Sequence, residues 1–274
     1  MRITVFTSNQ PRHAALIAGL ARIADIVYAV QECTTVFPGR VADFFRKSEV
    51  MQRYFQHVMA AERAVFGRPR FGPPNAIHMP LKMGDLNMLD LDAFGPALKS
   101  DAYIVFGASY IKGPLCDFLV SRGACNIHMG TSPYYRGSST NFWALYDQRP
   151  EYVGATIHRL TTGLDSGPML FHAFPPTTAV DPFILGMQAV RAAHEALIQR
   201  LASGELWDFE PVPQDRSQEL RYTRNADFDD SVAAEYLDRL SPPEHIEAAL
   251  ADRDLTRFLR PYVAANACVG AVTV

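Results

Sequence analysis

The 274-residue chain is 48% hydrophobic and 20% charged, so it can bury a full core and is not expected to be disordered. Its formal charge of −3 argues against a surface devoted to nucleic acid and favours a small-molecule partner. The four cysteines form no CxxC pair, no apolar run approaches the roughly 18 residues of a membrane span, and the start lacks a signal peptide. We therefore expect a cytoplasmic protein with reduced thiols and no membrane contact.

The N-terminal half predicts strands that alternate with helices. In chain order these are a strand over 2–6, a helix over 12–23, a strand over 24–30, a helix over about 41–66, a short strand over 77–79, a helix over 90–98, a strand over 101–108 and a helix over 115–121. The apolar residues of the long helix repeat every 3.6 residues, which is typical of core packing but also suits a lid or a subunit contact. Strands joined by helices usually pair in parallel.

The C-terminal half predicts further strands and then helices. The elements are a strand over 123–128, a helix over 140–148, strands over 153–160 and 169–173, a helix over 181–201, an extended or irregular segment to residue 223, and helices over 227–240 and 244–259. The expected class is α/β, with a mostly parallel sheet covered by helices on both faces. We divide the chain into a catalytic domain over 1–210 and a C-terminal extension of uncertain role over 211–274.

The turn after the first strand contains polar residues that could bind an anion. Ser8, Asn9 and Arg12 lie where the carboxyl end of a strand meets a helix N-terminus, a common place for ligands in α/β sheets. No GxGxxG follows this strand, so a dinucleotide site of the usual kind is not supported. These residues either contact the substrate, or cap the helix and meet solvent.

The main chemical signal lies between residues 125 and 170. Asn126 and His128 alternate around Ile127 in a strand, so both side chains project to one face near the strand's carboxyl end. Asp165 follows in a turn flanked by glycines. An imidazole beside a carboxylate can hold or deliver a proton near neutral pH, and an Asn amide can donate to a developing oxyanion. The three side chains therefore form a candidate catalytic centre for acyl transfer.

The same residues could instead have purely structural roles. A buried histidine is more often hydrogen-bonded than catalytic, and an Asp beside glycines is often only a turn residue. Cys125 should face the opposite side of the strand, and no GxSxG elbow marks a serine nucleophile. The spacings of His158 and His172 match no metal-ligand pattern, so no metal is expected.

Two motifs resemble those of the folate-dependent formyltransferases. Asn126-Ile127-His128, Pro133 and Tyr135-Arg136-Gly137 are similar to the family signature NIHPSLLPxYRG, and the segment GLDSGP over 163–168 resembles its GLDTG element. The family includes methionyl-tRNA formyltransferase, glycinamide ribonucleotide formyltransferase, amino-sugar N-formyltransferases and 10-formyltetrahydrofolate deformylase. The resemblance covers about residues 1–210 and implies a Rossmann-like formyltransferase fold with an Asn126, His128 and Asp165 centre.

The resemblance also implies a donor and its contacts. The formyl donor would be 10-formyltetrahydrofolate, and the acceptor a primary amine of a small molecule, such as a nucleotide-linked amino sugar or an amino acid. The expected donor contacts are Phe106, Gly107, Ala108, Ser109, Tyr110, Ile111, Gly163, Leu164, Ser166 and Gly167. The expected acceptor contacts are Ser8, Asn9, Arg12, Tyr134, Tyr135 and Arg136, although the two tyrosines could equally pack the loop and the arginines could simply be solvated.

The loop next to His128 departs from the family pattern. Residues 129–132 read Met-Gly-Thr-Ser where the family usually has Pro-Ser-Leu-Leu, so acceptor recognition or the reaction itself could differ. The alternatives left open are methionyl-tRNA formyltransferase, which the short C-terminal region disfavours, a 10-formyltetrahydrofolate hydrolase, and a non-catalytic folate-binding sensor. A homodimer is also left open.

Overall fold

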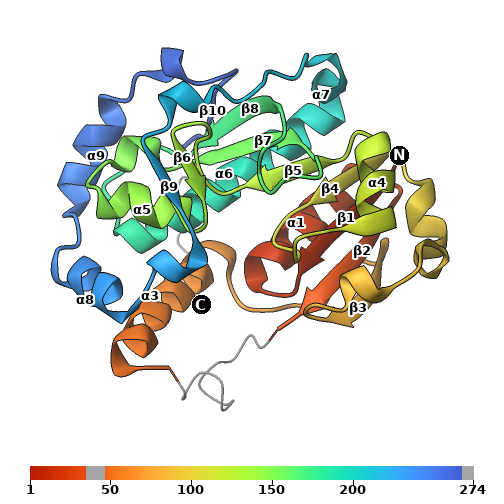
Figure 1. The fold of residues 1–274 in the computed structure, drawn as a ribbon, viewed down its shortest axis with the longest axis horizontal. Coiled ribbons are helices and arrows are strands. Elements are labelled where there is room, and N and C mark those ends of the chain that lie inside the picture. Colours follow the sequence, from red (N-terminus) through yellow and green to blue (C-terminus); the bar gives the residue numbers. More distant parts are fainter. Residues whose placement is uncertain (35–46, 267–274) are drawn as a thin grey trace.

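The computed structural model describes residues 1–34 and 47–266 and contains an eight-stranded sheet surrounded by helices (Figure 1). The sheet order is β10-β8-β7-β5-β4-β1-β2-β3. Its strands are β1 (Arg2–Ser8), β2 (Ile26–Cys33), β3 (Ala76–Lys82), β4 (Ala102–Val105), β5 (Cys125–His128), β7 (Ala155–Arg159), β8 (Met169–Phe174) and β10 (Tyr262–Val263). A separate two-stranded sheet pairs β6 (Tyr135–Gly137) with β9 (Arg221–Thr223).

The helices lie between and around these strands. The α-helices are α1 (Pro11–Ala21), α3 (Glu49–Phe66), α4 (Gly113–Ser121), α5 (Thr140–Tyr146), α6 (Pro182–Ser203), α7 (Glu205–Asp208), α8 (Asp230–Asp238) and α9 (Pro243–Ala251). The 3₁₀ helices are η2 (Leu86–Met88), η3 (Leu91–Lys99), η4 (Pro150–Tyr152), η5 (Arg216–Gln218), η6 (Asn225–Asp227) and η7 (Leu255–Arg257). No helix in these described ranges is both long and apolar enough to span a membrane.

Most neighbouring strands of the large sheet run parallel. β1 pairs in parallel with β2 and β4, β2 with β3, β4 with β5, and β8 with β10. β7 is antiparallel to both of its neighbours, β5 and β8. This arrangement confirms the expected α/β class with a mostly parallel sheet, and it brings the carboxyl ends of β1, β4 and β5 to one edge.

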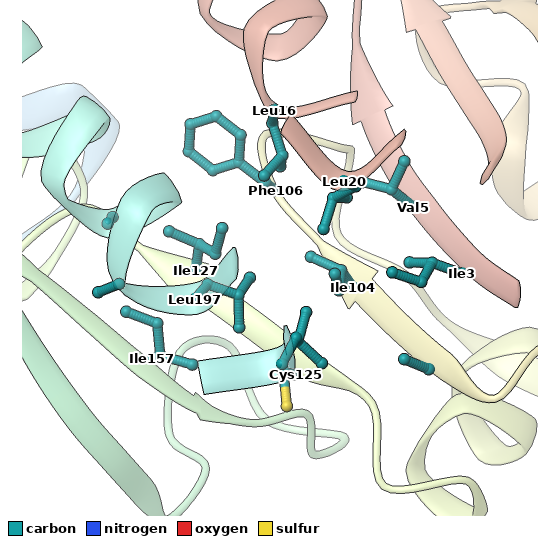
Figure 2. Close-up of a cluster of buried hydrophobic side chains, with 14 of the residues drawn as sticks. Ile3, Val5, Leu16, Leu20, Ile104, Phe106, Cys125, Ile127, Ile157 and Leu197 are labelled. Carbon is teal, nitrogen blue, oxygen red and sulfur yellow. The ribbon is translucent and has the colours of Figure 1, made fainter. Parts of the chain in front are cut away.

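The main core lies between one face of the sheet and two helices, α1 and α6. Leu16 and Leu20 of α1 and Leu197 of α6 pack against alternate residues of the strands, among them Cys125 and Ile127 of β5 (Figure 2). Because side chains alternate along a strand, burying Cys125 and Ile127 here turns Asn126 and His128 to the opposite face. The packing of β5 therefore orients the polar pair, as the sequence indicated.

Two further clusters of buried side chains complete the core. One includes Leu115 and Leu119 of α4 and Phe94 of η3, which pack against Phe6 and Val105. The second is rich in aromatic residues and joins α3, α5, α6, α8, α9 and β8; its buried members include Tyr135, Phe142, Trp143, Phe174, Phe183 and Tyr236. Helices thus cover both faces of the sheet, as predicted.

Several predicted boundaries need correction. The strand over 101–108 ends at Val105, and the helix over 90–98 is the 3₁₀ helix η3, which has a positive φ of 44° at Gly95 followed by Pro96. The helix over 244–259 ends at Ala251 because Asp254 caps a new 3₁₀ turn, with its carboxylate accepting from the amide of Thr256 at 3.1 Å. α3 begins at Glu49, and residues 41–46 of the predicted helix lie outside the described residues.

The segment after residue 210 packs onto the rest of the chain. β9 pairs in parallel with β6, the strand that follows the loop next to His128, and β10 extends the large sheet at β8. Gly137 allows the β6–β9 contact, because a Cβ at this position would overlap the carbonyl of Thr223 and its φ is +91°. The boundary at residue 210 remains a prediction, whereas the close packing of the segment is observed.

His172 of β8 joins the loop next to the site to the C-terminal segment. Its buried ring donates from Nε2 to the carbonyl of Ser132 at 2.7 Å and accepts from the amide of Leu259 at Nδ1 at 3.0 Å. This pair of bonds requires the neutral ring, because a protonated ring has no acceptor nitrogen. Burial lowers the pKa of His172 to about 4.

Stability should therefore fall with acid in a defined window. In the unfolded chain the ring takes up a proton near pH 6.5, whereas in the folded protein it does so only near pH 4. Between these two values acid therefore stabilises the unfolded state relative to the folded state, and the free energy of unfolding falls. We expect His172 to contribute about 3 kcal/mol of this loss in the free energy of urea unfolding. His172→Asn should flatten the slope between pH 6.5 and 4, whereas the same change at exposed His245 should not. Equal slopes for wild type and His172→Asn would contradict this account.

Candidate active site

A cavity of about 330 Å³ opens at the carboxyl ends of β4 and β5. Its walls include the loop over 106–111, the turn that contains Asp165, and the start of α1. Many of the residues expected from the sequence line it, namely Arg12, Phe106, Gly107, Ala108, Ser109, Tyr110, Ile111, Asn126, His128, Gly163, Leu164 and Asp165. The cavity therefore brings the expected catalytic centre together with most of the expected donor contacts.

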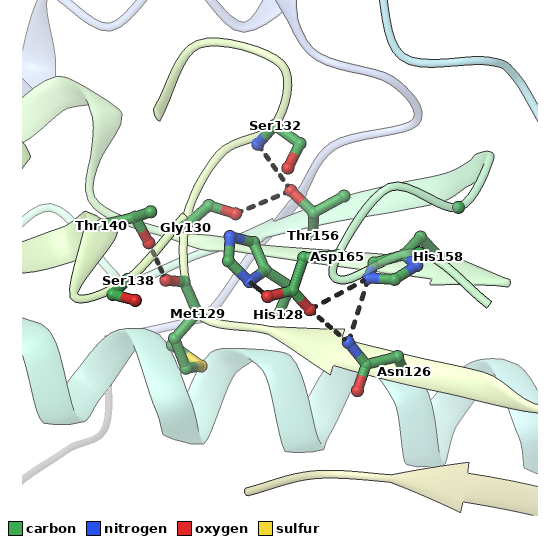
Figure 3. Close-up of polar contacts among 12 residues, drawn as sticks. Asn126, His128, Met129, Gly130, Ser132, Ser138, Thr140, Thr156, His158 and Asp165 are labelled. Carbon is green, nitrogen blue, oxygen red and sulfur yellow. Dashed lines mark hydrogen bonds and ion pairs between the residues drawn. The ribbon is translucent and has the colours of Figure 1, made fainter. Parts of the chain in front are cut away.

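Asn126, His128 and Asp165 are in direct contact (Figure 3). The Nδ1 atom of His128 lies 3.3 Å from Oδ2 of Asp165, and Nδ2 of Asn126 donates to Oδ1 of the same carboxylate at 2.9 Å. Asn126 and His128 are buried, whereas the Asp165 side chain is 23% exposed. One carboxylate thus holds both neighbours, each through a different oxygen.

His158 is a fourth member of this cluster and was not expected from the sequence. It pairs with Asn126 across β5 and β7, and its Nε2 lies 3.0 Å from Nδ2 of Asn126. Since Nδ1 of His158 can only donate to the carbonyl of Arg159 at 2.8 Å, Nε2 must be the acceptor. Both hydrogens of the Asn126 amide are then used within the protein. If the Asn126 amide were flipped, its oxygen would face the Asp165 carboxylate, and two acceptor oxygens cannot form a hydrogen bond. The flipped orientation is therefore excluded.

The carboxyl group of Asp165 is held in its ionised form. Burial alone would raise its pKa, but His128 outweighs that effect and keeps the pKa well below its usual range. Asp165 also adopts a left-handed conformation with φ of 46°, which Asp tolerates better than most residues. The ionised carboxylate can accept hydrogen bonds from both Asn126 and His128.

The turn around Asp165 is supported from the C-terminal segment. Nε2 of Gln214 donates to the carbonyls of Asp165 and Gly167, at 2.9 Å each. Gly167 packs so closely that a Cβ would overlap the carbonyl of Arg159 and lie 2.8 Å from Nδ1 of His158. Gly167 does not line the cavity, and Ser166 lines only the second cavity described below. Their contacts with a donor remain predictions.

Some main-chain groups of the loop over 106–111 form hydrogen bonds within the described residues, and others do not. Ser109 donates its amide to the buried carboxylate of Glu32 at 2.6 Å, and Asn87 donates its side-chain amide to the carbonyl of Tyr110 at 2.9 Å. The main chain of Gly107 and Ala108 forms no hydrogen bond with the described residues. These two residues are therefore the part of the loop that can bind a ligand through its main chain. The hydroxyl of Tyr110 donates to the carbonyl of Thr162 and so joins this loop to the turn that contains Asp165.

The turn after β1 is occupied by internal contacts. Ser8 donates to the carbonyl of Glu32 at 2.7 Å, and Asn9 forms hydrogen bonds with the main chain of Thr34 at 2.8 and 2.9 Å. Arg12 reaches the cavity but forms an ion pair with Glu62 of α3 at 2.8 Å. Ser8 and Asn9 do not line the cavity. This turn thus has fewer free groups for an acceptor than its sequence suggested.

The tyrosines expected to contact the acceptor are buried in the aromatic cluster. The hydroxyl of Tyr134 donates to the carbonyl of Arg257 at 2.8 Å, and that of Tyr135 donates to Asp147 at 3.1 Å. Neither residue lines the two cavities described here. Their observed contacts match the alternative left open from the sequence, in which they pack the loop.

Gly130, in the loop over 129–132, packs closely against Thr140. Thr140, at the start of α5, donates its hydroxyl to the carbonyl of Met129, and a Cβ on Gly130 would overlap the Thr140 side chain. The same Cβ would lie 3.2 Å from Nε2 of His128, a buried atom with no partner among the described residues. A serine at position 130 would therefore need Thr140 to move.

A second cavity, of about 490 Å³, adjoins the first. The two share Gly163, Leu164 and Asp165. Its other lining residues are Arg136, Gly137, Ser166, Arg216, Glu219 and Tyr222. The expected acceptor residue Arg136 thus lies in this second cavity.

Two observations concern the other potentially reactive side chains in the described parts of the chain. Residues 1–34 and 47–266 contain no group of three or more His, Cys, Asp or Glu side chains that could hold a metal ion. Burial raises the pKa of Cys125 to about 11, so this thiol is protonated at neutral pH and is a poor nucleophile. Cys33, Cys116 and Cys125 are free thiols, and Cys268 lies outside the described residues.

Comparison with known proteins gives a consistent result. No protein-family model matches the sequence. The chain is 26% identical over 121 residues to methionyl-tRNA formyltransferase of Synechocystis sp.. The aligned residues cover 44% of this chain and 36% of that protein. It is 31% identical over 123 residues to methionyl-tRNA formyltransferase of Anaeromyxobacter sp., covering 44% of this chain and 39% of that protein. These matches therefore span well under half of each relative.

The fold has a counterpart among solved structures. A 4-N formyltransferase from Francisella tularensis superposes with a TM-score of 0.51 at 15% identity, covering 92% of this chain and 86% of that one. The protein thus has the formyltransferase fold. The curated relatives and this fold agree with the resemblance to the folate-dependent formyltransferases that the two motifs carry.

Proposed function

We propose that this protein transfers a formyl group from 10-formyltetrahydrofolate to the primary amine of a small molecule. The observation that supports this most directly is the contact of Asn126, His128 and Asp165 at one end of a cavity whose wall includes the Gly107–Ala108 main chain. A flat donor with amide-like edges could bind the free main-chain groups there, while its formyl carbon lies near His128. The donor supplies the activated formyl group.

His128, Asp165 and Asn126 would then stabilise the charge that develops during the reaction. As the neutral amine attacks the formyl carbon, the carbonyl oxygen becomes negative, and a protonated His128 stabilises it. Asp165 favours that protonated form of His128. Asn126 would assist by exchanging its bond to His158 for one to the oxygen, since both of its N–H groups are engaged in the free protein. The amine loses its proton, the bond to the folate nitrogen breaks, and that nitrogen is protonated.

The reaction can be tested directly with pooled substrates. The protein is incubated with 10-formyltetrahydrofolate and a pool of amino sugars, amino acids and nucleotide-linked amines, and the products are followed by mass spectrometry. We expect one amine to gain a formyl group as tetrahydrofolate accumulates. Tetrahydrofolate formed without any formylated amine would indicate a hydrolase, and tight folate binding without turnover would indicate a sensor.

Methionyl-tRNA formylation is the second candidate function. It is favoured by the curated relatives, which are methionyl-tRNA formyltransferases, although the match covers only 36% of the first of them. Incubation with charged initiator tRNA and 10-formyltetrahydrofolate separates the two candidates. Formylation of the tRNA at a rate above that of every small amine would replace the small-molecule assignment.

Gln214 should act as a positioning residue. Gln214→Ala removes two hydrogen bonds to the turn around Asp165, each worth about 1 kcal/mol, and should lower kcat about 10-fold. The control is Gln218→Ala in the same segment, because Gln218 is exposed and donates only to Asp215 at 3.0 Å. A loss in kcat that is measured where urea unfolding shows the variant to be fully folded supports positioning. A fall in stability that accounts for the whole loss of activity would contradict it.

A further inference from the structure

Glu32, near the end of β2, has a buried carboxylate that joins two loops at the edge of the sheet where the first cavity opens. Its Oε1 atom accepts from the amide of Gly84, in the turn after β3, at 2.8 Å. Its Oε2 atom accepts from the amide of Ser109, in the loop over 106–111, at 2.6 Å. One side chain therefore ties the loop that follows β4 to the turn that follows β3.

The bond to Ser109 fixes one end of the short segment formed by Gly107 and Ala108. At the other end, Phe106 still belongs to the sheet region, because its amide donates to a carbonyl of β1 at 2.9 Å. Between these two points, Gly107 has a φ of +70°, which favours glycine. The main chain of Gly107 and Ala108 is thus suspended between two anchors, and Glu32 provides the second one.

A carboxylate suits this position because both of its partners are donors. An ionised carboxylate presents only acceptor oxygens, whereas a glutamine amide presents one oxygen and one NH2 group. In Glu32→Gln, either orientation of the amide would direct its NH2 group at the N–H of Gly84 or of Ser109. One hydrogen bond would be lost and the other would no longer be charge-assisted. This substitution therefore releases the loop while it preserves the size of the side chain.

From these contacts, and resting on the proposed formyl transfer, we infer that Glu32 is a positioning residue for the formyl donor. Glu32 lines neither cavity, so it acts through the loop rather than by touching a ligand. By fixing Ser109, it holds the main chain of Gly107 and Ala108 in the conformation that receives the flat ring of the donor. The affinity for the donor should then depend on Glu32, whereas the affinity for the amine should not.

Isothermal titration of the full chain with tetrahydrofolate tests this role. Wild type should bind tetrahydrofolate, and Glu32→Gln should raise its Kd about 10-fold, because a charge-assisted bond to the loop is lost. The titration is made where urea unfolding shows each variant to be fully folded. In the formylation assay, the KM of the donor should rise in parallel, while the KM of the amine and kcat at saturating donor stay within about twofold of wild type.

Asn75→Ala is the matched control for a loss of hydrogen bonds at the sheet. Asn75 directly precedes β3, at the opposite end of the strands, and donates to the carbonyls of Ala21 and Ala24 at 2.9 and 3.0 Å. Removing these bonds should lower the free energy of unfolding but leave the Kd of tetrahydrofolate unchanged. The comparison separates an effect on the loop from a general loss of stability.

A second variant keeps the test decisive if Glu32→Gln does not fold. Asn87 is exposed, donates to the carbonyl of Tyr110 at 2.9 Å and accepts from the amide of Lys112 at 2.8 Å, so it holds the far end of the same loop. Asn87→Ala should raise the Kd of tetrahydrofolate about 5-fold. An unchanged Kd would show that fixing this loop does not affect the donor, and the role assigned to Glu32 would be wrong.

The outcomes separate this inference from the proposed function. If wild type and Glu32→Gln bind tetrahydrofolate equally well, or if Glu32→Gln raises the KM of the amine as much as that of the donor, the positioning role is wrong, even if pooled amines are formylated. If wild type does not bind tetrahydrofolate, the proposed donor fails together with the role of Glu32. Tetrahydrofolate binding that weakens as expected, without formyl transfer to any amine, would overturn only the proposed function.

Discussion

Asp165→Asn is expected to lower the rate of formyl transfer by about 100-fold or more. The substitution preserves the size of the side chain, and the amide oxygen can still accept from Asn126. It removes the negative charge that lies 3.3 Å from Nδ1 of His128, so the protonated imidazole loses its stabilisation. Initial rates of tetrahydrofolate formation with the identified amine measure the effect.

The pH dependence sharpens this prediction. The pKa of Asp165 is held well below its usual range, so the carboxylate is ionised throughout the pH range of an activity assay. The wild-type rate should therefore show no loss from protonation of Asp165 in this range, and the amide of Asp165→Asn, which does not ionise, cannot regain the charge at any assay pH. The matched control is Asp117→Asn, which neutralises an exposed carboxylate on α4. Activity of Asp165→Asn within a few-fold of wild type would show that this carboxylate has no role in the reaction.

Gly167→Ala is expected to destabilise the protein by about 3 kcal/mol. The added methyl group would overlap the carbonyl of Arg159, which is also the acceptor for Nδ1 of His158. The nearest atoms are the main chain of Arg159 and the ring of His158, and hydrogen bonds to Arg159 and Asn126 hold that ring in place. The strand β7 or the turn around Asp165 must shift, and either shift disturbs the contacts of Asn126. The free energy of urea unfolding measures the loss.

Gly186 provides the control for this glycine substitution. It lies inside α6, and a Cβ there would meet no atom within 4 Å. Gly186→Ala should therefore leave the fold intact and stabilise it by up to about 1 kcal/mol, because Ala is the better helix former. If Gly167→Ala is as stable as wild type, the close packing between this turn and β7 is not required.

The sequence predicted the site best where polar side chains fall within a regular alternation of apolar residues. Alternation in the strand over 123–128 predicted that Asn126 and His128 share a face, because Cys125 and Ile127 are apolar and need a core. The succession of strands and helices predicted the parallel part of the sheet. The motifs around His128 and Asp165 then indicated which two distant segments meet.

Contacts that depend on tertiary pairing could not be predicted in the same way. His158 reaches Asn126 only because β7 runs antiparallel to β5, and the alternation of residues in β7 does not specify its direction. Gln214 comes from a segment that reads as irregular, so nothing local links it to the turn it supports. Ser8 and Asn9 are ordinary polar turn residues in the sequence, and only the structure shows their bonds to the main chain at Glu32 and Thr34.

The proposed transfer of a formyl group to an amine depends on His128. The most direct test follows tetrahydrofolate and formylated amine together in one time course, with wild type and His128→Ala, in the presence and absence of the amine found by the pooled assay. We predict equal amounts of both products with wild type, none without the amine, and a rate at least about 100-fold lower in His128→Ala. A His128→Ala rate within a few-fold of wild type, or tetrahydrofolate formed equally without amine, would contradict the account.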